Sequence, residues 1–333
     1  MDFKERLDLV KRNTQEILVE DELVDLLKNV KNPKSYLGIA TTGQFHMGYF
    51  VPLGKMLDFD RAGIKNTLLI ADIHAALDDL KCKWEELDLK ADYYKKCVEL
   101  GFPWENKPEF VEGSSFQLRK EYQYDVLRMS TILTVSRATR AASEVTRMKN
   151  PKVSELIYPI MQALDEQYLE TDIQLGGIDQ RHILAMAREY LPQVGYKKRV
   201  EIMTPLVVSL RGPGVKMSAS IPDSHIKIYE DENSIKNKIN KAYCPEGIID
   251  DNPILQLYKY VLFPIKQKIK IERDIKFGGD TIFNNYSELE KVFVEKKLHP
   301  VDIKQTLTKH LIEIFKKIRE YFDKNKDLIP KFN

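Results

Sequence analysis

The sequence is poor in cysteine, in long apolar runs and in excess charge of either sign. Its three cysteines lie far apart and form no Cys-x-x-Cys pair, which argues against a disulfide framework or a zinc site and favours a reducing compartment. No apolar run approaches the roughly 18 residues of a membrane span. The start from Met1 to Arg6 is charged and lacks the apolar core of a signal peptide. We therefore expect a cytoplasmic protein with no membrane partner.

Charge and length further limit the possible partners and the number of domains. The chain carries 52 basic and 50 acidic residues, a net charge of +2, so it is no polycation and a nucleic acid would have to be held by local basic patches. With 333 residues, 43% of them hydrophobic, it can form one large domain and a smaller one.

The N-terminal part alternates apolar runs with helical patterns. Residues 3–29 are helical by pattern, and residues 35–40 read as a short buried strand that enters a turn at residues 41–44. A helix is expected over residues 46–62 and a second strand over residues 66–71. Strand, turn, helix and strand in this order predict a parallel sheet with a right-handed crossover.

The remaining segments complete an α/β fold. Residues 108–112 and 200–203 are strand candidates, and residues 115–150 are helical with mixed charge. Helical patterns, lysines and turn signals dominate after about residue 225. We place a boundary near residues 222–232 and expect a small α-helical domain beyond it, with no further C-terminal domain.

Three polar residues share one stripe of a predicted helix. Tyr158, Gln162 and Asp165 lie within about 60° of each other, because a helix turns about 100° per residue, and their neighbours are mostly apolar. Apolar surroundings with a few convergent polar groups are typical of a small-molecule pocket. The alternative is a polar surface stripe.

Two distant motifs suit a phosphate. His46-Met47-Gly48 begins the helix of the first crossover, where free N–H groups and the helix dipole favour an anion. The loop Lys216-Met217-Ser218-Ala219-Ser220 offers an ammonium group and hydroxyl donors. Either motif alone is also compatible with a helix cap or a surface turn.

The two motifs together resemble the signature motifs of class I aminoacyl-tRNA synthetases. Within that class the chain resembles the tyrosyl-tRNA synthetases of archaeal and eukaryotic type. The resemblance runs from about Tyr36 to Asp302. It includes the segments Ala40–Gly43, Ala71–Ala75, Tyr158–Asp165, Gly176–Arg181, Lys241–Cys244, Phe277–Gly279 and His299–Asp302.

The resemblance implies a two-domain enzyme. A Rossmann-type catalytic domain over residues 1–225, with a dimer-forming insertion at about 105–150, would precede a helical anticodon-binding domain over residues 226–333. The substrates would be L-tyrosine, ATP with Mg²⁺, and tRNA(Tyr), and the assembly a homodimer. No residue is assigned to a protein-bound metal.

The resemblance also implies roles for individual residues. Tyr36 and Asp165 would bind the substrate phenol, while Tyr158, Gln162 and Gln180 would hold the amino-acid end. His46, Lys216 and Ser218 would act on the phosphates. The ATP site would further contain Gly43, Gly48, Gly177, Asp179, Met217 and Ser220, and the tRNA would be contacted by Arg181, Phe277, His299 and Asp302.

Some positions depart from the family pattern, and two alternatives stay open. Gln44 and His182 stand where a lysine is common, which removes positive charge near the phosphates and beside Arg181. A tryptophanyl-tRNA synthetase shares the fold, but an indole N–H gains nothing from Tyr36 as a donor. A catalytically silent RNA-binding paralogue would be expected to have lost His46 or Lys216.

Overall fold

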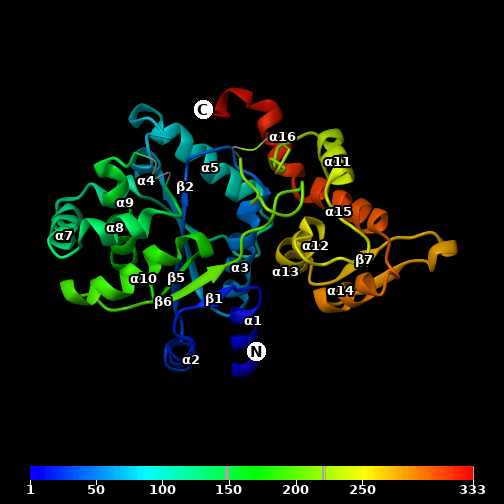
Figure 1. The fold of residues 1–333 in the computed structure, drawn as a ribbon, viewed down its shortest axis with the longest axis horizontal. Helices are drawn as coiled ribbons and strands as arrows, with labels where there is room; N and C mark the ends of the chain where they lie inside the picture. The colour runs from blue at the N-terminus through cyan, green and yellow to red at the C-terminus, as the bar shows by residue number, and fades with distance from the viewer. Residues whose placement is uncertain (147–149, 220, 222, 333) are drawn as a thin grey trace.

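A six-stranded, mostly parallel sheet forms the centre of the larger part of the molecule (Figure 1). The computed structural model describes residues 1–146, 150–219, 221 and 223–332. The strand order is β1-β6-β5-β2-β3-β4, and every neighbouring pair is parallel except β1 with β6. The strands are β1 (Glu16–Ile17), β2 (Lys34–Ala40), β3 (Lys65–Ala71), β4 (Glu109–Glu112), β5 (Ile173–Gly177) and β6 (Val200–Thr204).

Helices cover both faces of this sheet, as buried parallel strands require. Figure 1 shows α7 to α10 on one side and α3 on the other. The helices are α1 (Phe3–Lys11), α2 (Glu20–Asn29), α3 (Phe50–Arg61), α4 (Asp72–Leu77), α5 (Leu87–Gly101), α6 (Ser114–Gln117), α7 (Lys120–Ser130), α8 (Val135–Ala142), α9 (Val153–Tyr168) and α10 (Arg181–Tyr190). Short 3₁₀ turns lie between them: η1 (Met47–Tyr49), η2 (Trp84–Glu86), η3 (Ile178–Gln180) and η4 (Leu191–Val194).

The predicted first crossover is confirmed. β2 and β3 are parallel neighbours joined by η1 and α3, with Tyr36 in register with Thr67. The helix proper begins at Phe50, a turn later than predicted, because His46 caps the 3₁₀ turn that precedes it. The predicted α/β fold with a parallel sheet is therefore correct, and the sheet edge after β2 carries the first phosphate motif.

The prediction of continuous helix over residues 3–29 is wrong. α1 ends at Lys11, Asn13 takes a positive φ of 59°, and β1 then pairs with β6 before α2 begins. Arg12 and Asn13 turn the chain sharply enough to bring residues 16–17 to the sheet edge. Segment 115–150 is likewise divided, into α7, α8 and turns, and Arg147 lies outside the described residues.

The C-terminal part is mostly helical, but it also contains a two-stranded hairpin that the sequence analysis did not predict. Its elements are α11 (Glu232–Lys241), α12 (Pro253–Leu257), the π-helical turn η5 (Tyr258–Leu262), α13 (Phe263–Lys266), β7 (Ile269–Ile271), η6 (Ile275–Phe277), β8 (Thr281–Phe283), α14 (Tyr286–Val294), α15 (Pro300–Ile314), α16 (Lys316–Lys324) and η7 (Lys326–Leu328). The strands β7 and β8 are antiparallel. One apolar cluster runs from α3 and α5 into α12, α15 and α16. The boundary at about residue 225 stays a prediction.

None of the helices in the described parts of the chain is long and apolar enough to cross a membrane.

Candidate functional site

The predicted site residues lie near the carboxyl ends of the parallel strands, where ligands of open α/β sheets bind. His46 follows β2 and Asp179 follows β5, and His74, which was not among the predicted site residues, follows β3. α9 packs against one face of this sheet and carries the polar stripe of Tyr158, Gln162 and Asp165. The chain therefore brings segments that are far apart in sequence to one edge of the sheet.

The phenol end of the predicted pocket is built around Asp165, whose side chain is 1% exposed. One carboxylate oxygen, Oδ1, accepts hydrogen bonds from Gln117 Nε2 and from the Tyr122 hydroxyl, each at 2.8 Å. The other oxygen, Oδ2, has no hydrogen-bond donor among the described residues. A buried acceptor left in this state can receive the hydroxyl of a ligand.

His74 lies beside that unfilled oxygen, with Nε2 3.8 Å from Asp165 Oδ2. Burial lowers the pKa of His74 to about 4, so the imidazole is neutral at pH 7 and the contact is no ion pair. Burial also raises the pKa of Asp165 to about 8, although the donors Gln117 and Tyr122 oppose the shift. The pocket floor thus contains a desolvated carboxyl group without a cationic partner.

Tyr36 is buried next to this group, as predicted, but its hydroxyl is directed to the backbone of α9. The Tyr36 hydroxyl donates to the Gln162 carbonyl at 3.1 Å. The family resemblance pairs Tyr36 with Asp165 as the two groups that bind a phenol. No hydrogen bond joins the two within the described structure, so a shared ligand contact stays a prediction.

The remaining pocket residues line the same side of α9. Tyr158 and Gln162 are 7% and 8% exposed, which excludes the alternative of a polar surface stripe. The Tyr158 ring packs edge-on against His74, with ring centroids 4.6 Å apart. Gln180 closes the far end: a Cβ atom at Gly176 would collide with its side-chain oxygen, so the glycine makes room for the amide.

Gln117 and Tyr122 were missed by the sequence analysis. They lie at the end of α6 and in α7, a stretch interpreted only as helical and mixed in charge. Tyr122 is fully buried and Gln117 is 0% exposed. A Gln and a Tyr five residues apart have no distinctive spacing, so only the fold reveals that both face Asp165.

The phosphate end starts at His46, which caps η1 by accepting the Gly48 N–H on Nδ1 at 3.1 Å. Burial, and then the neighbouring His225, lower the pKa of His46 to about 3. The ring is therefore neutral and, with Nδ1 accepting, Nε2 carries its proton. That N–H is the donor that a phosphate oxygen would require. A Cβ atom at Gly48 would lie 2.7 Å from the His46 ring.

The second phosphate motif packs over the first. Met217 approaches Gly48, and Ala219 approaches Gly43, with 3.7 Å and 3.3 Å between the side chain and the Cβ position of each glycine. Lys216 Nζ lies 3.1 Å from Asp179 Oδ2. Ser218 is described and half-buried, whereas Ser220 lies outside the described residues. The structure thus unites the two motifs that lie about 170 residues apart.

Asp179 also approaches Gly177 closely, since a Cβ atom there would stand 2.5 Å from Asp179 Oδ1. The carboxylate consequently lies against the end of β5 and binds the loop lysine.

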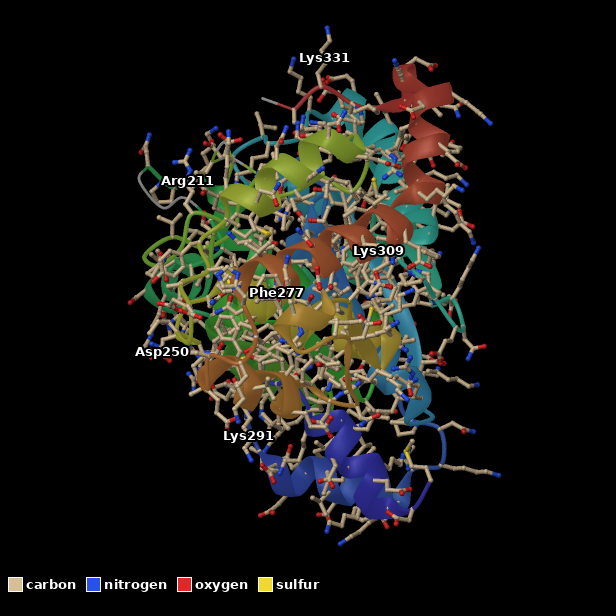
Figure 2. The ribbon with its side chains drawn as sticks, turned by 90° about the vertical axis from the view of Figure 1, so that its right-hand side faces the viewer. Arg211, Asp250, Phe277, Lys291, Lys309 and Lys331 are labelled. Atoms are coloured by element: carbon tan, nitrogen blue, oxygen red, sulfur yellow. The ribbon has the colours of Figure 1, made fainter. Side chains whose placement is uncertain are left out.

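The predicted RNA-contacting residues fall in two places. Arg181, at the start of α10, binds Glu16 through Nε at 2.7 Å and a second nitrogen at 2.8 Å. His299 caps α15 by accepting the Val301 N–H, and Asp302 lies in the first turn of that helix. Phe277 is 63% exposed and lies on the same outer face as Lys309 (Figure 2).

Comparisons with known proteins agree with this geometry. The model of the class I tRNA synthetases for W and Y matches residues 28–316. The chain is 43% identical to the cytoplasmic tyrosine–tRNA ligase of Gallus gallus, over 96% of this chain and 61% of the relative. It is 44% identical to the tyrosine–tRNA ligase of Methanococcoides burtonii, over 96% of this chain and all of the relative.

A solved structure is also similar. The tyrosyl-tRNA synthetase of Archaeoglobus fulgidus, crystallised with L-tyrosine, superimposes with a TM-score of 0.91 at 41% identity, covering 96% of this chain and 99% of that one. The chain spans about three fifths of the length of the vertebrate relatives it matches.

Proposed function

The chain belongs to the class I tRNA synthetases for tryptophan and tyrosine, and from this premise we propose that it joins L-tyrosine to tRNA(Tyr) at the expense of ATP. The observation that carries the choice of tyrosine over phenylalanine is Asp165. Its buried Oδ2 has no donor in the described structure and stands beside the neutral His74. A phenol hydroxyl supplies the missing donor, and phenylalanine cannot.

The reaction has two steps. The carboxylate of tyrosine attacks the α-phosphorus of ATP, and pyrophosphate leaves with the electron pair of the broken P–O bond. A hydroxyl of the terminal adenosine of the tRNA then attacks the carbonyl carbon of tyrosyl-adenylate, loses its proton and releases AMP. The substrate itself supplies the first nucleophile, so the protein contributes positioning and electrostatic stabilisation.

The proposed roles divide along the site. Tyr158, Gln162 and Gln180 hold the amino and carboxylate groups, and Tyr36 stands beside the phenol. His46 Nε2–H and the Lys216 ammonium group donate to phosphate oxygens as negative charge develops. The nucleotide would further contact Gly43, Gly48, Gly177, Asp179, Met217, Ser218 and Ser220.

Mg²⁺ is expected to arrive with the triphosphate. Within the described parts of the chain, no three His, Cys, Asp or Glu side chains are grouped to hold a metal ion. The ion would neutralise charge on the phosphates.

Contacts with tRNA are proposed at two surfaces. Arg181, beside the catalytic site, would contact the acceptor stem, whereas Phe277, His299 and Asp302 would contact the anticodon. An exposed aromatic ring is a stacking platform for an unpaired base. These contacts would make residues 226–333 the anticodon-binding part, and we expect the protein to work in the cytoplasm.

Homodimer formation is proposed through the segment at about 105–150 and its neighbours. Large apolar side chains in this region are exposed: Leu118 by 60%, Tyr124 by 62%, Leu127 by 66%, Val135 by 70% and Val153 by 73%. A concentration of apolar residues on a surface marks an interaction site. A second copy of the chain is the partner that we propose.

Amino-acid-dependent exchange between pyrophosphate and ATP tests the proposal. We expect exchange with tyrosine, far weaker exchange with phenylalanine and none above background with tryptophan, followed by charging of a tRNA(Tyr) transcript. Exchange with tryptophan alone would identify the other enzyme of the family. RNA binding without any exchange would identify a catalytically silent paralogue.

A further inference from the structure

A row of polar side chains crosses the sheet beneath the proposed pocket. Tyr36 on β2 is in register with Gln174 on β5, and Gln174 is in register with Glu201 on β6. Side chains in register on neighbouring strands point to the same face. Gln174 is 1% exposed and Glu201 is 0% exposed. The row therefore leads from Tyr36 into the interior of the molecule.

Glu166 on α9 joins this row from above and is also 0% exposed. The Gln162 carbonyl that accepts the Tyr36 hydroxyl at 3.1 Å also accepts the N–H of Glu166, since helical hydrogen bonds join residues four apart. Tyr36 and Glu166 thus meet at one carbonyl. Burial raises the pKa of Tyr36 most, and the charges of Asp165, Glu166 and Glu201 raise it further.

The row contains acceptors without donors. Both carboxylate oxygens of Glu166, both of Glu201 and the Gln174 side-chain oxygen are buried and receive no hydrogen bond within the described structure. The two guanidinium groups nearby are engaged elsewhere. Arg188 donates to the Arg199 carbonyl and to Glu22, and Arg199 donates to Thr171, Lys197 and Gln167.

Two ionised carboxylates in this position would be costly, because each is shielded from bulk solvent and receives no hydrogen bond from the described residues. A proton on one of them removes a charge and provides a donor for a neighbouring oxygen. We propose that Glu166 and Glu201 together hold a proton at neutral pH and, through Gln174, position Tyr36 for the phenol of the substrate. The positioning part rests on the proposed function.

The surrounding charges are consistent with proton retention. Burial raises the pKa of both Glu166 and Glu201, and the charge of Glu166 adds to the shift of Glu201. Arg199, which directly precedes β6, and Arg188 from α10 oppose both shifts. Asp165 on α9 raises the pKa of Glu166, and Glu22 on α2 raises that of Glu201.

Replacement of the carboxyl groups by amides tests the positioning role. Glu166→Gln and Glu201→Gln keep side-chain size but change which atoms donate, so we expect KM for tyrosine to rise about three- to tenfold with kcat within about twofold. Glu170→Gln, on an exposed carboxylate just beyond α9, should change neither value. An unchanged KM in both row variants overturns the positioning role.

The pH dependence of unfolding tests the proton without using activity. A glutamate whose pKa is raised on folding stabilises the protein below its unfolded pKa, and that stability is lost as pH rises toward the folded value. Between about pH 5 and 8, we expect the free energy of unfolding to fall less steeply with pH in Glu166→Gln/Glu201→Gln than in the unmodified protein. The two slopes should differ by the contribution of one proton that the folded state binds and the unfolded state does not. An equal slope overturns the shared proton.

Infrared spectroscopy gives a second test that does not require a stable variant of the row. Asp78→Asn/Asp165→Asn removes the two other carboxyl groups whose pKa is raised by burial, so a protonated-carboxyl C=O band that persists at pH 7 in this variant supports the proposal. Absence of such a band overturns it. If the unmodified protein shows no tyrosine-dependent exchange, the proposed function fails, whereas the slope and the band still decide whether the proton is held.

Discussion

At the scale of single residues, the pocket separates selectivity from general affinity. Asp165 accepts two hydrogen bonds on Oδ1 and keeps Oδ2 for a ligand, so it contacts the part of tyrosine that phenylalanine lacks. Gln162 lies one turn away on α9 and is assigned to the end that all amino acids share. The two residues should therefore give different kinetic signatures.

Asp165→Ala should lower the ratio of kcat/KM for tyrosine to kcat/KM for phenylalanine by about 10- to 100-fold, because only tyrosine has a hydroxyl that is left without its buried hydrogen-bond partner. Gln162→Ala is the matched comparison and should reduce both values alike. The measurement is pyrophosphate exchange with each amino acid. An unchanged ratio in Asp165→Ala would refute its assignment to the phenol.

Lys216→Ala should slow adenylate formation about 100-fold, since a donor to the transition-state phosphates is lost. Tyrosine affinity should change by less than about twofold, because the lysine contacts Asp179 and not the amino-acid pocket. Pre-steady-state kinetics separates the two quantities. Lys198→Ala, on an exposed lysine, is the control; a normal rate in Lys216→Ala would remove the proposed role.

At the scale of elements, the helices and strands that could be predicted were those with long, periodic sequence patterns. The crossover from β2 through α3 to β3 was predicted because apolar strands of seven residues flank a turn with glycine. β1 was not, since two residues carry no periodicity and their pairing with β6 is set by tertiary contacts. The hairpin β7–β8 was not predicted for the same reason, because the sequence pattern of a three-residue strand cannot be distinguished from that of a loop.

The site shows the same division. Tyr158, Gln162 and Asp165 share one helix, so their convergence follows from helical periodicity. The contact of Lys216 with Asp179 links two segments whose separation only the folded chain reveals. Gln117 and Tyr122 have polar side chains whose burial is decided by α9, and no local pattern indicates it.

The junction of α1 and α3 offers a stability prediction. The Lys55 ammonium group is buried and donates to the carbonyls of Leu9 and Val10 at 3.0 and 2.8 Å, and it lies 3.2 Å from Asp58. Lys55→Met removes these donors and should lower the free energy of unfolding by about 1–3 kcal/mol at pH 7. Lys11→Met, which breaks an exposed ion pair, should cost less than about 1 kcal/mol.

The same lysine gives a pH signature. Burial lowers the pKa of Lys55 to about 8, although Asp58 opposes the shift. Above about pH 8 the folded state releases this proton while the unfolded state keeps it up to about pH 10.4, so stability gains from Lys55 as pH rises through that window. Denaturant unfolding at several pH values should show this contribution in the unmodified protein and lose it in Lys55→Met.

At the scale of the whole molecule, the exposed apolar side chains of α7, α8 and the start of α9 are the surface that we assign to a second copy of the chain. Leu127→Glu places a charge on this surface and should convert a dimer into a monomer, because burial of an unpaired carboxylate opposes association. Light scattering after gel filtration measures the mass. Ile275→Glu, on an apolar residue of η6 that is 91% exposed, should leave the assembly intact; a dimer that survives Leu127→Glu would argue against this surface.

The ion pair between Arg181 and Glu16 couples the strand β1 to a residue that we propose binds RNA. In the proposed role, a phosphate of the acceptor stem competes with Glu16 for the same guanidinium group, so the two occupancies are thermodynamically linked. When tRNA binds Arg181, β1 loses one contact with the rest of the protein. Conversely, the Arg181–Glu16 ion pair lowers the affinity for tRNA by the same factor. The short edge strand β1 should therefore respond to tRNA binding. Amide hydrogen exchange at residues 15–18 should become faster when tRNA binds and stay unchanged when only tyrosine and ATP bind.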